Sequence, residues 1–121
     1  MGLFSNKEAT KKDPLEAYRN EIQEFLLEDE KIEELYSLLL DYVCITNKRL
    51  IFVDKSIMDQ EVEIVTLPFS KIETISVVKN SKMFALTDKI KIMTKNKDYE
   101  LKFIKNTNVK EFYNSLARNI I

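Results

Sequence analysis

Histidine is absent from this sequence, and cysteine and glycine occur once each. Histidine is the commonest catalytic general base, and zinc sites are built largely from His and Cys, so both chemistries lack their usual residues here. The only glycine is Gly2, which leaves no glycine-rich loop to bring backbone amides close to a phosphate group. We therefore predict that the protein is not an enzyme and that it holds no metal and no cofactor.

The lone cysteine and the lack of long apolar runs indicate in which cellular compartment the protein is expected. Cys44 has no second cysteine to pair with and lies in an apolar stretch, which predicts a buried thiol in a reducing compartment. No stretch approaches the ~18 consecutive apolar residues that a membrane-spanning helix needs. The first residues contain no hydrophobic segment of the kind found in secretory signals. We expect a cytoplasmic protein with no transmembrane segment.

The composition that remains is that of one folded domain. Hydrophobic residues make up 45% and charged residues 32% of the 121 positions, proportions typical of a globular domain with its own core. One glycine and two prolines predict few loops and short connections between elements.

The stretch over residues 41–55 is the strongest structural signal in the chain. Residues 42–45 and 50–53 are short runs rich in β-branched and aromatic side chains, separated by a polar turn that contains Asn47. Asparagine tolerates the left-handed backbone of tight turns, so this unit is predicted to be a β-hairpin. Both runs are apolar at consecutive positions, which predicts strands that are covered on both faces.

Five further strands are predicted from alternating or apolar segments around this hairpin. The leucine-rich first segment is also compatible with a helix. The predicted strands are residues 31–40, 61–67, 71–79, 89–94 and 99–104, with polar turns at 54–60 and 95–98 and a loop at 80–88 that carries a small apolar group.

A helix is predicted at each end of this set of strands. Asp13 has the features of an N-cap before Pro14, and the apolar spacing that follows predicts an amphipathic helix over residues 14–27. Its polar face is acidic, unlike that of helices that anchor to anionic membranes, so the helix either lies on the domain's own surface or docks onto a partner. An acidic run at residues 28–30 is predicted to be a solvated connector. Thr107 is the predicted N-cap of the last helix, whose apolar stripe comprises Val109, Phe112, Tyr113, Leu116, Ala117 and Ile120.

The letters T-N-K-R-L-I-F-V-D-K at residues 46–55 resemble the hairpin of the bacterial pleckstrin-homology-like domains, which have relatives among the GRAM domains. The resemblance spans roughly residues 28–119. It implies two packed, strongly bent antiparallel sheets of seven strands in total, with the last helix plugging one open end. The predicted division is a disordered tail (1–12), an N-terminal helix (13–27) and a PH-like domain (28–121).

Charge is distributed unevenly along the chain. Residues 1–78 hold nine Lys or Arg against sixteen Asp or Glu, whereas residues 79–121 hold ten against four. One interpretation is internal balance between neighbouring strands. Another is that the basic part binds a partner, and the candidate partner-binding residues are Lys48, Arg49, Lys79, Lys82, Lys89 and Lys91.

Several partner classes can be weighed from the sequence. The PH domains that hold inositol phosphates use basic residues between their first two strands, whereas this chain has Leu40 and Asp41 there, so we expect no phosphoinositide binding. The pI of about 5.6 and the few aromatics among the lysines argue against nucleic acid.

The favoured hypothesis is a protein-binding or self-assembling module. Bacterial domains of the resembling family associate into rings, which implies a homo-oligomer here, and an unidentified protein is a further expected partner. Unpaired sheet edges and the contrast between acidic and basic parts are consistent with a head-to-tail contact. The alternative is a domain that uses its basic C-terminal half to bind a lipid surface or nucleic acid.

Overall fold

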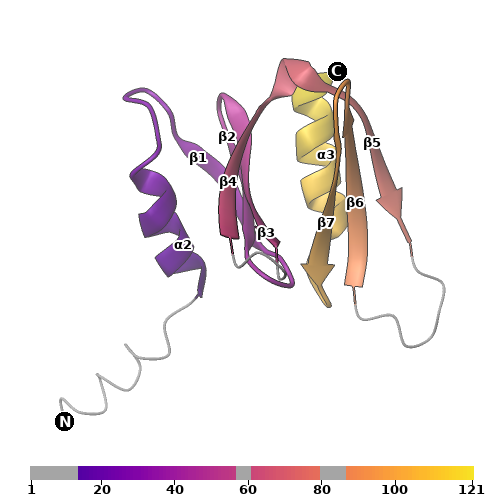
Figure 1. Cartoon of the computed structure of the whole chain (residues 1–121), viewed down its shortest axis with the longest axis horizontal. Coiled ribbons are helices and arrows are strands. Elements are labelled where there is room, and N and C mark those ends of the chain that lie inside the picture. Colours follow the sequence, from indigo (N-terminus) through magenta and orange to yellow (C-terminus); the bar gives the residue numbers. More distant parts are fainter. Residues whose placement is uncertain (1–13, 57–60, 80–86) are drawn as a thin grey trace, which may run out of the picture.

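The computed structural model describes residues 14–56, 61–79 and 87–121, and Figure 1 shows the arrangement of their helices and strands. Two antiparallel sheets face each other, and α3 runs alongside the smaller one. The elements are α2 (Pro14–Gln23), β1 (Ile32–Ser37), β2 (Tyr42–Thr46), β3 (Arg49–Ser56), β4 (Glu61–Pro68), η1 (Phe69–Lys71), β5 (Ile72–Val78), β6 (Thr87–Thr94), β7 (Asp98–Ile104) and α3 (Val109–Ile120).

The topology confirms the predicted seven strands in hairpin succession. One sheet has the order β1-β2-β3-β4 and the other β5-β6-β7, and neighbouring strands are antiparallel throughout. The sheets meet at one corner, where Leu38 forms a bridge with Phe103 and the Leu39 N–H donates to the Lys102 carbonyl oxygen at 2.8 Å. The fold is therefore the bent, mainly β architecture that the resemblance implies.

The main core lies between the two sheets and α3. Amphipathic α3 turns its apolar stripe toward this core, where Phe112 and Leu116 are fully buried. The helix is also held by polar contacts to β1: the Tyr36 hydroxyl contacts the carboxylates of Glu34 and Glu111, and the Ser115 hydroxyl donates to Glu34. Burial and the hydrogen bonds to Glu111 and Glu34 raise the pKa of Tyr36 above its usual range.

A second, smaller core lies on the outer face of the four-stranded sheet and is covered by α2. Ile22 of α2 is fully buried there, and the Tyr18 ring lies 4.6 Å from the Tyr42 ring. All five residues of β2 are buried, because the first four side chains enter the two cores alternately and Thr46 packs against Glu30. This confirms the prediction, from consecutive apolar positions, that the hairpin strands are covered on both faces.

Several predicted boundaries are wrong by a few residues. The first helix ends at Gln23, not at residue 27, because the next three backbone N–H groups bond to carbonyl oxygens three residues back, as in turns, and not four residues back. β1 ends at Ser37, before a tight turn in which the Leu38 N–H donates to the Asp41 carbonyl oxygen at 2.6 Å.

Two further boundaries differ in the later part of the chain. β3 continues to Ser56, so the turn predicted over residues 54–60 starts too early. The N-cap of α3 is Asn108, whose side chain accepts from the Glu111 N–H, and not Thr107. The predicted tail, the Asp13 cap and residues 80–86 of the predicted apolar loop lie outside the described residues.

Replacing Phe112 by Ala tests whether α3 is an integral part of the core. The ring is fully buried against Tyr36 and Phe103, so its loss should lower the free energy of unfolding by about 3 kcal/mol or more. Urea unfolding followed by circular dichroism measures this. Replacement of the exposed Lys110 in the same helix by Ala is the control, and an equal, small effect of both changes would contradict the docking of α3.

Candidate functional site

The polar turn between β2 and β3 is organised by the hydroxyl of Thr46. Its oxygen accepts hydrogen bonds from the backbone N–H groups of Lys48 and Arg49, both at 3.0 Å. It donates to the Glu30 carboxylate at 2.6 Å. A short side chain that bonds to backbone two and three residues ahead fixes a tight turn, so the shape of this hairpin is encoded locally.

Arg49 forms a two-pronged ion pair with Glu30 beneath this turn. Its Nε and Nη2 atoms lie 2.8 Å from the two carboxylate oxygens. The guanidinium group also donates to the Phe25 carbonyl oxygen at 2.7 Å and to the Thr66 hydroxyl at 3.0 Å. One side chain thus joins the segment after α2, the hairpin and β4, in the planar geometry that suits guanidinium and carboxylate groups.

The Glu30 carboxylate is buried and fully satisfied. The residue is only 5% exposed, and its side chain also accepts from the Leu27 N–H at 3.0 Å. Burial alone would raise the pKa of Glu30, but hydrogen bonds from Arg49 and Thr46 outweigh it and lower the pKa to about 2. The prediction of a solvated connector over residues 28–30 is therefore wrong for Glu30.

Asn47 and Lys48 at the tip of the turn add contacts to the Arg49–Glu30 ion pair. The Asn47 side chain accepts from the Lys31 N–H at 2.8 Å and donates to the Asp29 carbonyl oxygen at 3.2 Å. The Lys48 ammonium group lies 3.2 Å from the Asp29 carboxylate. All four residues of the T-N-K-R segment thus hold the connector between α2 and β1.

The candidate partner-binding residues do not form a single surface. Arg49 pairs with Glu30 and Lys48 pairs with Asp29. Only 18% of the Arg49 side chain is exposed. Lys89 and Lys91 share the outer face of β6, where Lys89 lies 3.6 Å from Glu100 of β7. Exposed Lys79 follows the end of β5, and Lys82 lies outside the described residues.

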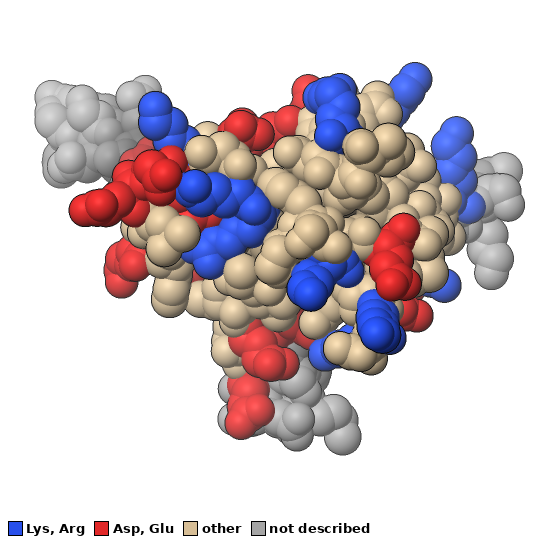
Figure 2. Space-filling model, turned by 90° about the horizontal axis from the view of Figure 1, so that it is seen from above, with Lys and Arg blue, Asp and Glu red and all other residues tan. Residues whose placement is uncertain are grey.

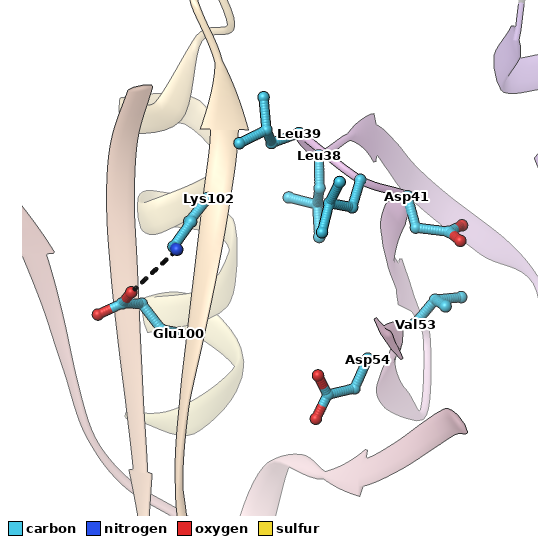
Figure 3. A pocket seen from close by; sticks show the side chains of 8 residues that line it. Leu38, Leu39, Asp41, Val53, Asp54, Glu100 and Lys102 are labelled. Atoms are coloured by element: carbon cyan, nitrogen blue, oxygen red, sulfur yellow. Dashed lines mark ion pairs between the residues drawn. The ribbon is translucent and has the colours of Figure 1, made fainter. Parts of the chain in front are cut away.

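A pocket of about 170 Å³ lies beside the turn between β1 and β2. Figure 3 shows Leu38, Leu39 and Asp41 of that turn above Val53 and Asp54 of β3, with Glu100 and Lys102 of β7 on the other side. The pocket sits where β3 and β7, from different sheets, stand apart. Sequence reasoning assigned Leu38–Leu40 to a strand and so missed this site.

The charged lining of the pocket is mainly acidic, and exposed leucines lie beside it. Three carboxylates and one ammonium group line it, and the ammonium group of Lys102 is already within 4.0 Å of Glu100. Leu39 and Leu40 beside it are 53% and 55% exposed. An excess of carboxylates repels phosphate groups, whereas exposed leucines contribute apolar area to a protein contact.

The described residues offer little for other kinds of site. Burial raises the pKa of the Cys44 thiol to about 12, so it is not a thiolate at neutral pH. In residues 14–56, 61–79 and 87–121, no three Cys, Asp or Glu side chains gather closely enough to hold a metal ion. None of the helices there has the length and apolar character to cross a membrane.

Comparison with known proteins adds a family to this geometry. The family model for the bacterial PH domain matches residues 3–120, a range that includes α2. The uncharacterized protein YozO of Bacillus subtilis (strain 168) is 34% identical over 120 residues, which cover 99% of this chain and 98% of YozO. YjqA of the same organism, also uncharacterized, is 36% identical over 77 residues, which cover 63% of this chain and 61% of YjqA.

Solved structures show the same fold. A pleckstrin homology domain from Shewanella amazonensis SB2B superposes with a TM-score of 0.69 and 21% identity, and 88% of each chain is covered. A duf1696 family protein with a pleckstrin-homology domain from Shewanella loihica PV-4 superposes with a TM-score of 0.70 and 21% identity, covering 88% of this chain and 93% of that one.

The lowered pKa of Glu30 predicts how stability depends on pH. The folded-state value of about 2 lies below the ordinary 4.5, so the ionised carboxylate stabilises the fold above pH 4.5. This contribution of roughly 3 kcal/mol is lost as the pH falls toward 2. Chemical denaturation of the wild type and of Glu30→Gln at several pH values isolates it, because the variant lacks the titrating group.

The control for that experiment is Asp29→Asn, which removes a neighbouring carboxylate whose side chain is 76% exposed. The difference in unfolding free energy between wild type and Glu30→Gln should shrink with acidification, while that for Asp29→Asn stays small at every pH. Parallel pH profiles for wild type and Glu30→Gln would contradict the role assigned to Glu30.

Proposed function

We propose that this chain, which belongs to the bacterial PH domain family, is a non-enzymatic module that binds protein in the cytoplasm, and that its main partner is another copy of itself. The observation that carries this proposal is the separation of charge between two sides of the molecule. Acid-rich residues 1–78 include α2 and the four-stranded sheet, and base-rich residues 79–121 include β6, β7 and α3. Figure 2 shows acidic side chains on the side of α2 beside a group of basic ones, and on the opposite side basic side chains are more prominent than acidic ones.

Opposite charges on opposite sides favour a head-to-tail contact. Such a contact uses two different surfaces of the same molecule and closes into a ring when the rotation between copies permits. Long-range attraction would speed encounter and select the orientation of the copies. The acidic and basic parts belong largely to different elements, so a contact between two copies can bring them together as well.

The sheet edges supply a second support for self-assembly. Within the described residues, β4 and β5 each end a sheet and have a strand partner on one side only. Exposed Val62 on β4 and Val77 on β5 add apolar area beside these edges, at 58% and 38% exposure. An unpaired edge can take a strand from another chain, which would give a ring affinity as well as orientation.

Nucleic-acid binding is the second candidate. It is favoured by Lys89, Lys91 and Lys102, which the strand register places on the outer face of the smaller sheet. Glu100 lies between these lysines and pairs with two of them, which lowers the positive charge on offer. Binding of a generic DNA duplex and single strand at low salt tests this class, and the absence of binding there would remove it.

Sedimentation velocity tests self-assembly directly. We expect species larger than the 14.3 kDa monomer at high protein concentration, shifting toward monomer in high salt because surface charge is screened. The substitution Val62→Lys places a charge beside the β4 edge and should weaken the assembly further. Leu27→Lys, which adds the same charge at an exposed apolar residue outside the strands, is the control. A 14.3 kDa particle at every concentration and salt would end the proposal.

Liposome co-sedimentation tests the exclusion of phosphoinositides. The turn between β1 and β2 carries Asp41, and its pocket carries more carboxylates than ammonium groups, so adding phosphoinositide to neutral vesicles should not increase binding. The variant Lys48→Gln removes the exposed cation of the hairpin tip without disturbing Arg49. Headgroup-dependent, salt-sensitive binding that this variant abolishes would overturn the expectation.

A further inference from the structure

A basic groove of about 510 Å³ lies at the end of the molecule opposite the β1–β2 turn. It is bounded by η1 on one side and by the turn between β6 and β7 on the other, and Figure 2 views the molecule from this end. Its charged lining is three lysines and one carboxylate. The lining residues on which the argument rests are Ser70, Lys71, Glu73, Lys95, Asn96 and Lys97.

The backbone that carries these lysines is fixed by local contacts. In the β6–β7 turn the Thr94 hydroxyl accepts from the Lys97 N–H at 3.1 Å and donates to the Lys97 carbonyl oxygen at 2.6 Å. On the other side, Pro68 sets the entry into η1, which ends at Lys71. A groove whose walls are already ordered loses less entropy when a ligand binds.

The groove lysines differ from three of the lysines elsewhere in the described residues in how their charge is balanced. Lys48, Lys89 and Lys102 each lie within 4.0 Å of a carboxylate oxygen. In the described residues, no carboxylate lies within that distance of Lys71, Lys95 or Lys97.

The Lys97 ammonium group instead lies 5.0 Å from the centre of the Tyr99 ring. That ring also makes an edge contact with the buried Phe52. The aromatic contact restrains the Lys97 side chain and leaves its charge available to an anion.

We propose that this groove binds a ligand that carries linked phosphate groups, such as a soluble di- or triphosphate. Three ammonium groups match the several negative charges of linked phosphates better than the charge of one phosphate. The Ser70 hydroxyl and the Asn96 amide add neutral hydrogen-bond donors. The single carboxylate, Glu73, leaves a positive excess in the groove.

A soluble ligand with linked phosphate groups is favoured over a lipid that carries the same groups. The exposed acidic residues Glu28 and Asp29 lie in the connector between α2 and β1, which is at the same end of the molecule in Figure 1. An anionic bilayer approaching this end would meet those carboxylates as well as the groove, whereas a soluble ligand would not. This site is separate from the self-assembly proposed above and does not depend on it.

Titration with sodium tripolyphosphate, followed by amide chemical shifts of isotope-labelled protein, tests the proposal. We expect saturable shifts concentrated at residues 67–73 and 94–99, with affinity falling as salt rises. The triple variant Lys71→Gln, Lys95→Gln, Lys97→Gln should lose affinity about tenfold or more. The control variant, Lys31→Gln, Lys105→Gln, Lys110→Gln, removes the same charge from exposed sites outside the groove and should change affinity less than about twofold.

Two further arms make the outcomes distinct. Citrate is a polyanion without phosphate and should bind more weakly than tripolyphosphate. Neutral vesicles with a bisphosphorylated inositol lipid present the same groups on a membrane and should not co-sediment with the protein. Equal losses in both triple variants, shifts spread over the whole surface, equal binding of citrate, or binding to the vesicles without a response to tripolyphosphate would each overturn the proposal.

Discussion

The ion pair between Arg49 and Glu30 is the contact on which the N-terminal part of this fold depends. A carboxylate that is 5% exposed is costly to bury unless its oxygens are satisfied, and here Arg49, Thr46 and the Leu27 N–H satisfy them. The pair fixes the segment between α2 and β1 against the hairpin. Because that segment is fixed, α2 lies over the outer face of the larger sheet and buries it. Without α2, one face of β2 and β3 would be open to water.

This constraint changes how the hairpin motif is understood. Lys48 and Arg49 are cations in a polar turn, which suggests a binding surface. In the structure both form ion pairs with carboxylates of the same chain. The surfaces for which a function is proposed lie elsewhere, on the outer face of the smaller sheet, on the edges of β4 and β5 and in the groove between η1 and the β6–β7 turn. The motif therefore fastens the segment after α2 to a PH-like domain through contacts within the chain.

The sequence predicted the strands well and the polar contacts poorly, for physical reasons. The consecutive apolar residues in β2 and β3 predicted burial on both faces, and this pattern can be recognised from the local sequence alone. Glu30 looked like part of a solvated acidic run, because its partner is 19 positions away and nothing local marks the pair. The same limit hid the exposed leucines beside the pocket and the groove lysines, since those surfaces combine segments from different hairpins.

The rate at which a thiol reagent modifies Cys44 in the folded protein tests this account most directly. Cys44 is fully buried in the smaller core beneath α2, so modification requires α2 to leave the sheet or the protein to unfold. Arg49→Met should raise the rate far more than Phe112→Ala does at equal loss of global stability, because only the first change releases α2. Equal rates in the two variants would contradict the claim that the Arg49–Glu30 pair holds α2 in place.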